Sequence, residues 1–153
     1  MSSNIFNSKS TNKPEFAVIN VAQRAMTVMF SAVEKAPRRY HATIAKHLLY
    51  AGTSLLTNIF LANEVRVSGG KDWQLGAKDR QRLQLKAMKD TRMISFLATI
   101  LKELPNGLLA KQLAEILRLV YRCQKLLSDW MKSDVARYSR LESPLSKTPS
   151  KQQ

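Results

Sequence analysis

The sequence has a single cysteine, Cys123, and only two histidines, His41 and His47. One cysteine excludes an intrachain disulfide and a cysteine metal cluster, and so few ligand residues argue against a dedicated metal site. The motifs HExxH and GxSxG are missing, as is a glycine-rich phosphate loop. No two acidic residues have a spacing that suggests a general acid and base. We therefore expect a protein that uses no cofactor and is not an enzyme.

Uninterrupted apolar runs are also missing. The most apolar stretch, LLYAGTSLLTNIFLANEV, is interrupted by Gly52, Thr53, Ser54, Thr57 and Asn58, so we interpret it as a buried helix and not as a membrane span. The opening MSSNIFNSKSTNKP lacks the apolar segment of a secretory signal. We expect a cytoplasmic protein that does not associate with membranes.

Acidic side chains are scarce. There are 11 Asp and Glu residues against 25 Lys and Arg residues, which gives a net charge of +14 over 153 residues. A surface of this charge attracts polyanions, most simply nucleic acid, or the acidic face of a protein. The apolar residues, 44% of the chain, are enough for the core of one domain.

Four segments have helical periodicity, and none reads as a strand. They cover residues 15–36, 40–65, 77–104 and 108–132. Their breaks are Pro37, the segment VSGGKDWQLG and the turn at Pro105–Gly107. Helices of this length joined by short connections favour antiparallel neighbours. We predict an all-α, antiparallel up-and-down four-helix bundle over residues 15–133, with a disordered arm at 1–14 and a flexible tail at 134–153.

Apolar residues spaced by three and four predict the core face of each helix. In the last segment this face is Leu109, Leu113, Ile116, Val120, Cys123, Leu127 and Trp130. Cys123 is thus expected to be a small buried hydrophobe and not a reactive thiol. The first segment has two competing stripes: one is Phe16, Ile19, Gln23, Met26, Phe30 and Val33, and the other is Val18, Ala22, Ala25, Met29 and Ala32. So much apolar circumference indicates either self-association or a wide core.

Basic residues form a stripe on each of the last two predicted helices. An arc of about 80° on the last one, opposite its core face, holds Lys111, Arg118, Arg122, Lys125 and Lys132. An arc of about 120° on the third holds Lys78, Arg82, Lys86, Lys89 and Arg92. Three further cations, Arg38, Arg39 and Lys46, lie near the first turn.

A charged face can simply keep a helix in water. A face of nearly one sign, however, carries repulsion between residues four apart, and phosphates would relieve that repulsion. We therefore favour contact with nucleic acid or a nucleoprotein through these cations, largely independent of base sequence. Trp73, beside the glycines, could stack on an unpaired base. The commoner role for such a tryptophan is to close the end of a bundle.

Two motifs resemble the accessory variability determinant (Avd) family of diversity-generating retroelements, which belongs among wider four-helix-bundle proteins. VEKAPRRYHATIAKHLL, followed by LLTNIFLANEV, is similar to the family's VEKFPR…TLG.RL turn between its first two helices. LLSDWMKS is similar to the family's closing LGGWLKS, with Trp130 and Lys132 in register. The resemblance covers about residues 15–133, and it departs at Ala45 and at Ser128–Asp129, where the family has glycines.

The resemblance implies a non-catalytic protein that forms a ring-like, positively charged homopentamer. Such a protein binds the element's reverse transcriptase and its template RNA, or the cDNA, and supports mutagenic cDNA synthesis and retrohoming. Three alternatives stay open from the residues themselves. They are a four-helix adaptor for an acidic protein partner, a general RNA- or DNA-binding bundle protein, and a small helical enzyme.

Overall fold

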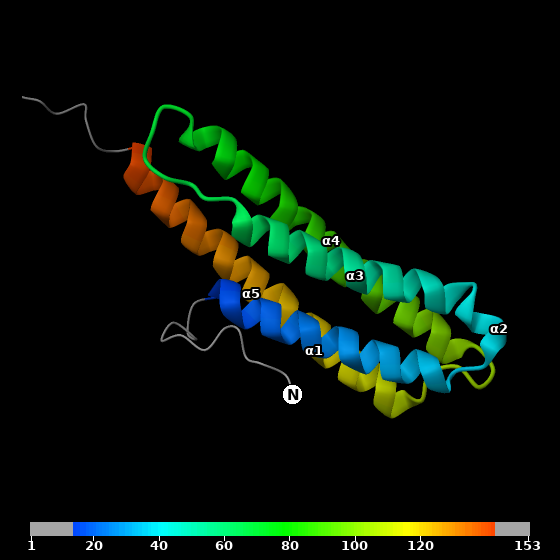
Figure 1. Cartoon of the computed structure of the whole chain (residues 1–153). Coiled ribbons are helices and arrows are strands. Elements are labelled where there is room, and N and C mark those ends of the chain that lie inside the picture. Colours follow the sequence, from blue (N-terminus) through cyan, green and yellow to red (C-terminus); the bar gives the residue numbers. More distant parts are fainter. Residues whose placement is uncertain (1–13, 143–153) are drawn as a thin grey trace, which may run out of the picture.

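A computed structural model describes residues 14–142, which form five helices and no strand (Figure 1). Four helices are long: α1 (Pro14–Lys35), α3 (Ile44–Glu64), α4 (Trp73–Glu103) and α5 (Ala110–Glu142). The fifth, α2 (Arg38–His41), is a single turn. The all-α prediction is confirmed for this part of the chain. The predicted arm lies outside the described residues except for Pro14, and so does the predicted tail from residue 143 onward.

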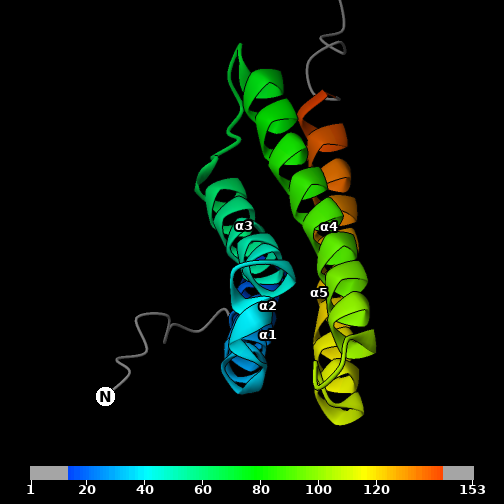
Figure 2. The same cartoon turned by 90° about the vertical axis from the view of Figure 1, so that its right-hand side faces the viewer.

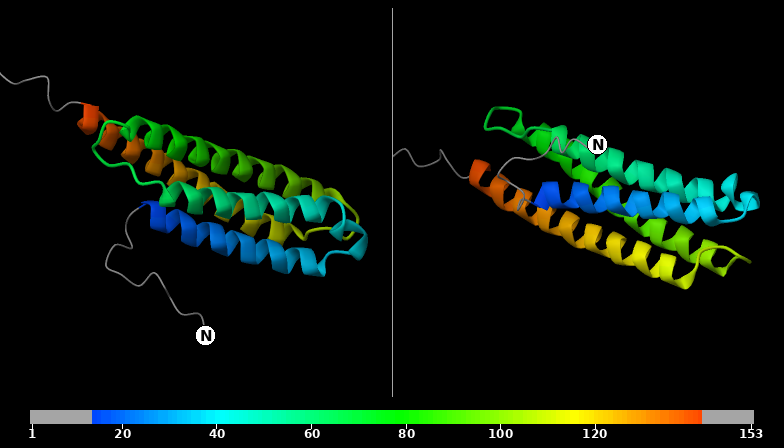
Figure 3. Two further views of the ribbon diagram at one scale, coloured as in Figure 1. Left: turned by 45° about the horizontal axis from the view of Figure 1, so that its top comes forward. Right: turned by 60° about the horizontal axis from the view of Figure 1, so that its bottom comes forward.

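The long helices lie side by side, and each one packs against two of the others. Helix α1 contacts α3 and α5, and α4 contacts the same two helices. Figure 2 shows the α1–α3 pair on one side of the molecule and the α4–α5 pair on the other. In Figure 3, α4 and α5 extend beyond the point where α1 begins. That overhanging end therefore has no α1 to cover it.

The connection around Pro37 differs in detail from the prediction. Helix α1 ends before Pro37, as expected, but the single predicted helix over 40–65 is divided into α2 and α3. The division falls at Thr43, whose backbone has φ −119° and ψ −112°. Its hydroxyl donates a hydrogen bond to the carbonyl of Tyr40 at 3.2 Å, which stabilises this local departure from helical geometry.

Two helix boundaries correct the prediction. Helix α4 begins at Trp73, so the last part of the predicted loop VSGGKDWQLG is helical. Helix α5 continues past Lys132 to Glu142, so residues 134–142 belong to a helix and not to a flexible tail. The reason is tertiary, because Asp134 is buried and bonded to Arg80 of α4.

The core of α1 is the second of its two predicted stripes. Its members are all buried: Val18, Ala22, Ala25, Met29 and Ala32. From the first stripe only Met26 and Val33 are buried, and Phe30 is 50% exposed. Gly52 of α3 makes room for one residue of each stripe, since a Cβ there would meet the side chains of Met26 and Met29. The buried face of α1 is therefore the second stripe together with Met26 and Val33 of the first.

On α5 the predicted core face is mostly confirmed. Ile116, Val120, Cys123, Leu127 and Trp130 are buried, while Leu113 is half-buried. Leu109 was predicted in this face but is 66% exposed, because it precedes the first residue of the helix.

Helix α1 is the one helix between residues 14 and 142 that is long and apolar enough to cross a membrane. The apolar stretch that the sequence suggested as the candidate span lies in α3 instead. In the structure, 44% of the apolar window in α1 is buried by other helices. A core helix of a bundle meets the same criterion of length and composition.

Candidate nucleic-acid interface

The predicted basic contact residues are all exposed, but the structure does not bring all of them together. Ten lie on α4 and α5, which are neighbours. The remaining three, Arg38, Arg39 and Lys46, lie at the opposite end from Lys78, near the turn that joins α4 to α5. They therefore form a separate group.

A groove runs along the outer side of α4 and α5. Its first section is lined by residues including Trp73, Ala77, Lys78, Val135 and Tyr138. Its second section is lined by Gln81, Leu85, Met88, Ser128, Met131, Lys132 and Val135. The two sections share Gln81, Met131 and Val135, so we treat them as one feature, the α4–α5 groove. Its floor is largely apolar, and each helix contributes a lysine to its lining.

One edge of each basic stripe borders this groove. Lys78, Leu85 and Arg92 recur every seven residues, which is close to two helical turns, so they follow one side of α4. On α5, Lys125 lies two turns before Lys132 on the same side of the helix. Lys78 and Lys132 line the groove itself, whereas Lys86 and Lys89 line a separate hollow with Ser54 and Asn58 of α3.

Two stripe residues are paired with acidic residues of their own helix. Arg82 contacts Asp79 at 2.6 Å, and Arg118 contacts Glu115 at 2.8 Å. The hydrogen bond from Arg118 lowers the pKa of Glu115, and the same bond raises the pKa of Arg118. Both pairs are solvent-exposed and therefore weak.

The other stripe residues make no ion pair with any residue between 14 and 142. These are Lys78, Lys86, Lys89, Arg92, Lys111, Arg122, Lys125 and Lys132. Their charge is available to a polyanion, and it is concentrated on two adjacent helices.

Two exposed aromatic residues accompany the cations and were missed by the sequence reasoning. Tyr121 lies on α5, one turn before Lys125, whose ammonium is 5.7 Å from the centre of the tyrosine ring. Phe96 lies on α4, one turn after Arg92, and is 63% exposed. Aromatic rings interleaved with cations suit single-stranded nucleic acid, because bases stack on them. The signal in the sequence was their spacing of four from a basic residue.

Arg39 has a structural role in addition to its charge. Its guanidinium donates a hydrogen bond to the carbonyl of Pro105 at 3.2 Å, and the Tyr40 hydroxyl donates to the same oxygen at 2.6 Å. The motif PRRY thus joins the α1–α3 connection to the turn between α4 and α5. Arg39 therefore has a structural role that does not require nucleic acid. Arg38 makes no such contact within the described residues.

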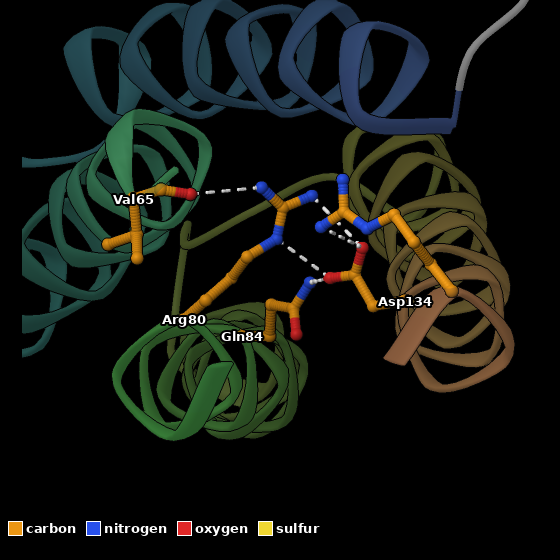
Figure 4. A network of polar contacts seen from close by, with 5 residues as sticks. Val65, Arg80, Gln84 and Asp134 are labelled. Atoms are coloured by element: carbon orange, nitrogen blue, oxygen red, sulfur yellow. Dashed lines mark hydrogen bonds and ion pairs between the residues drawn. The ribbon is translucent and has the colours of Figure 1, made fainter. Parts of the chain in front are cut away.

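A buried polar network supports one end of the groove (Figure 4). The Arg80 guanidinium donates to both carboxylate oxygens of Asp134, at 2.7 and 3.1 Å, and to the carbonyl of Val65 at 3.2 Å. The Gln84 amide also donates to Asp134, at 2.8 Å. Arg80 and Asp134 are 7% and 5% exposed. The network joins α4, α5 and the segment after α3, and it orients two residues that line the groove, Gln84 and Asp134.

Among residues 14–142, no group of three or more His, Cys, Asp or Glu side chains is placed to hold a metal ion. No known protein family, curated protein or solved structure matches the chain. The retroelement hypothesis therefore depends on the motifs of α1–α3 and α5 and on the basic groove.

Proposed function

We propose that this protein binds nucleic acid along the α4–α5 groove as a non-catalytic accessory protein of a diversity-generating retroelement. In this role it binds the reverse transcriptase and the template RNA and supports mutagenic cDNA synthesis and retrohoming. The observation that supports nucleic-acid binding most directly is that Lys78 and Lys132, which make no ion pair with residues 14–142, lie on the two sides of one apolar groove. Further cations lie on the same two helices. The Avd-like motifs support the retroelement role.

The dimensions of the stripes suit a nucleic-acid strand. From Lys78 to Arg92 the helix rises about 21 Å at 1.5 Å per residue. That length matches about six phosphates of one strand at 3.4 Å each. Contacts of this kind recognise phosphates and not base edges, so binding would depend weakly on sequence.

The test compares two variants of equal net charge. Lys125→Gln with Lys132→Gln removes two cations beside the groove, whereas Lys35→Gln with Lys102→Gln removes two from the ends of α1 and α4, outside the stripes. Affinity for a structured RNA is measured by fluorescence anisotropy over a series of NaCl concentrations. We expect the groove variant to bind more weakly and its log–log salt slope to fall by about 1.4, since each lost phosphate contact contributes about 0.7.

Equal losses in both variants would mean that only net charge matters and would remove the groove from the proposal. Failure of the wild-type protein to bind RNA would refute nucleic-acid binding. Binding to an acidic polypeptide in that case would support the adaptor alternative. Co-purification with a reverse transcriptase encoded beside its gene tests the retroelement role separately.

We further propose that the chain is an up-and-down four-helix bundle that assembles into a ring-like homo-oligomer, a pentamer by the Avd resemblance. An unusually neutral surface on α1 and α3 supports assembly. No charged residue lies between Lys46 and Glu64, and Phe30 and Phe60 are 50% and 55% exposed. Copies of a chain with +14 charge approach with least repulsion at such a face. The face lies away from α4 and α5, so assembly would leave the groove open (Figure 2).

Light scattering tests the assembly. We expect Phe30→Glu with Phe60→Glu to reduce the mass in solution to that of one chain, because a charge would enter the contact. Phe96→Glu is the matched control, since this exposed phenylalanine lies on α4. A mass unchanged by the double substitution would show that other surfaces hold the copies together.

A further inference from the structure

We propose that the Trp73 end of the α4–α5 groove holds one unpaired nucleobase of a bound single strand. This inference rests on the proposed function, because the groove must first attract the strand. It adds an enclosed base-binding site to a surface whose cations recognise phosphates. The site consists of Trp73, Ala77, Gln81, Met131, Val135 and Tyr138.

The walls of this section suit the face of a base. Trp73 and Tyr138 lie with ring centres 5.8 Å apart and ring planes tilted by 38°, so they form a corner and not a parallel slot. A base can therefore stack on one aromatic ring while its other face meets aliphatic side chains. Ala77, Met131 and Val135 provide those apolar surfaces. Stacking of this kind accepts any base.

Polar groups of the same section suit the edge of a base. The amides of Gln81 and Gln84 line it together with the carboxylate of Glu142. The Tyr138 hydroxyl is buried and has no hydrogen-bond partner between residues 14 and 142. Burial and the nearby Asp134 carboxylate raise the pKa of Tyr138, so its hydroxyl stays protonated. Because the oxygen is inaccessible in the free protein, the ring must turn toward the groove to donate this proton to a base.

The charges distinguish a base from a phosphate as the occupant. Among residues 14–142, two carboxylates, Asp134 and Glu142, line this section together with one basic residue, Lys78. Asp134 is neutralised by Arg80, but Glu142 would repel a phosphate placed beside it. A neutral base with an exocyclic amino group meets no such penalty. Its phosphate would instead lie toward Lys78, and the strand would continue along the groove toward Lys132.

Trp73 was expected to close the end of the bundle, and its contact with Tyr138 agrees with that role. The two roles are compatible, because Trp73 is only half-buried and also lines the groove. Trp130 could not bind a base in this way, since it is almost completely buried against Arg80 and has no free face.

The experiment compares two strands of equal length and charge. One is a single-stranded RNA of mixed sequence, and the other is an abasic phosphodiester strand. Their affinities are measured over a series of NaCl concentrations for the wild type, for Trp73→Ala and for Tyr50→Ala. Tyr50 is the matched control, because it is an exposed aromatic residue of α3 that does not line the groove.

We expect the wild type to bind the base-bearing strand more tightly by roughly 5- to 150-fold, the range that one stacked base provides. Trp73→Ala should lose most of this preference and keep the salt slope, while Tyr50→Ala should keep the preference. Val135→Trp gives an independent variant, because it fills the groove from an exposed position without removing a packed side chain. It should lose the preference too, and circular dichroism verifies that helix content is unchanged.

Equal affinity of the wild type for both strands would overturn the base site and leave the phosphate-binding function intact. A preference that survives both Trp73→Ala and Val135→Trp would also overturn it. If the wild type binds neither strand, the proposed function fails together with this inference.

Discussion

Arg80 is a cation of the core, in contrast to the basic residues that face solvent. Its guanidinium is held by Asp134 on one side and by the Val65 carbonyl on another. It also lies over the Trp130 ring, with 4.9 Å between the guanidinium carbon and the ring centre. Burying a charge in this way is costly unless the partner remains in place. The pair therefore makes the end of α5 depend on α4.

Replacing Asp134 with Asn should strongly destabilise the protein. The substitution keeps the shape of the side chain but leaves the Arg80 guanidinium buried without a counter-charge, which costs about 3–5 kcal/mol. Urea unfolding followed by circular dichroism measures the loss. Asp79→Asn is the control, because it breaks the exposed pair with Arg82 and should cost less than about 1 kcal/mol. Equal losses in the two variants would contradict the network shown in Figure 4.

Cys123 gives a second prediction for a single residue. Burial raises the pKa of its thiol from 9.0 to about 12. The native protein should therefore react with a thiol reagent at pH 8 far more slowly than the urea-unfolded chain, because the thiolate is the reactive form. The sign of the shift also has a consequence for stability. Between pH 9 and 12 the unfolded thiol ionises first, so the free energy of unfolding should fall as the pH rises. Rapid native labelling would show that Cys123 is accessible.

Among the elements, the turn between α4 and α5 is the most constrained. Asn106 has φ 55°, and the amide of Leu108 donates to the Leu101 carbonyl at 3.2 Å. A Cβ on Gly107 would overlap that carbonyl oxygen. The turn therefore requires glycine at this position for reasons of space.

Gly107→Ala should lower the free energy of unfolding by more than about 1 kcal/mol, since the backbone must move to admit a methyl group. Gly70→Ala is the control, because a Cβ there meets nothing within 4 Å. That variant should be neutral or slightly stabilised. Thermal unfolding of both proteins would measure the difference, and a neutral Gly107→Ala would contradict the geometry of the turn.

The sequence allowed the elements to be predicted where local residues determine them. Pro37 and the Pro105–Gly107 turn end helices through their own backbone chemistry, so those breaks were correctly placed. The end of α5 was not correctly placed, because DVARYSRLE has few apolar residues and its helix is held by the buried contact between Asp134 and Arg80. The rotation of α1 was also undetermined, since both of its stripes have helical spacing and only packing against the other helices shows that the second one is buried throughout.

The candidate site, like the helices, could be predicted from the sequence only in part. The two basic stripes could be found by spacing alone, and the structure leaves every member exposed. That Lys78 and Lys132 border one groove depends on α4 and α5 being neighbours, which no single helix encodes. The role of Arg39 at the Pro105 carbonyl needed the structure for the same reason, because the two residues are far apart in sequence.

For the whole molecule, the charge of +14 should make the folded state sensitive to salt. We expect the free energy of unfolding to rise between about 10 and 100 mM NaCl, as the screening length falls from about 30 to about 10 Å and repulsion weakens. Urea titrations at each salt concentration measure this. The free energy of unfolding of the Lys125→Gln and Lys132→Gln double variant should rise less with salt. RNA affinity, in contrast, should fall as salt is added. A free energy of unfolding that falls with salt would contradict self-repulsion.

The closed arrangement of the helices has a consequence for the order of folding. Three of its four contacts, α1–α3, α3–α4 and α4–α5, join helices that follow one another closely along the chain. The fourth, α1–α5, joins the two ends, so its closure costs the most chain entropy before any contact is gained. We expect the α3–α4 hairpin to form early and α1 to dock on α5 late. Substitutions in the α1–α5 contact should then mainly speed unfolding and leave the folding rate unchanged.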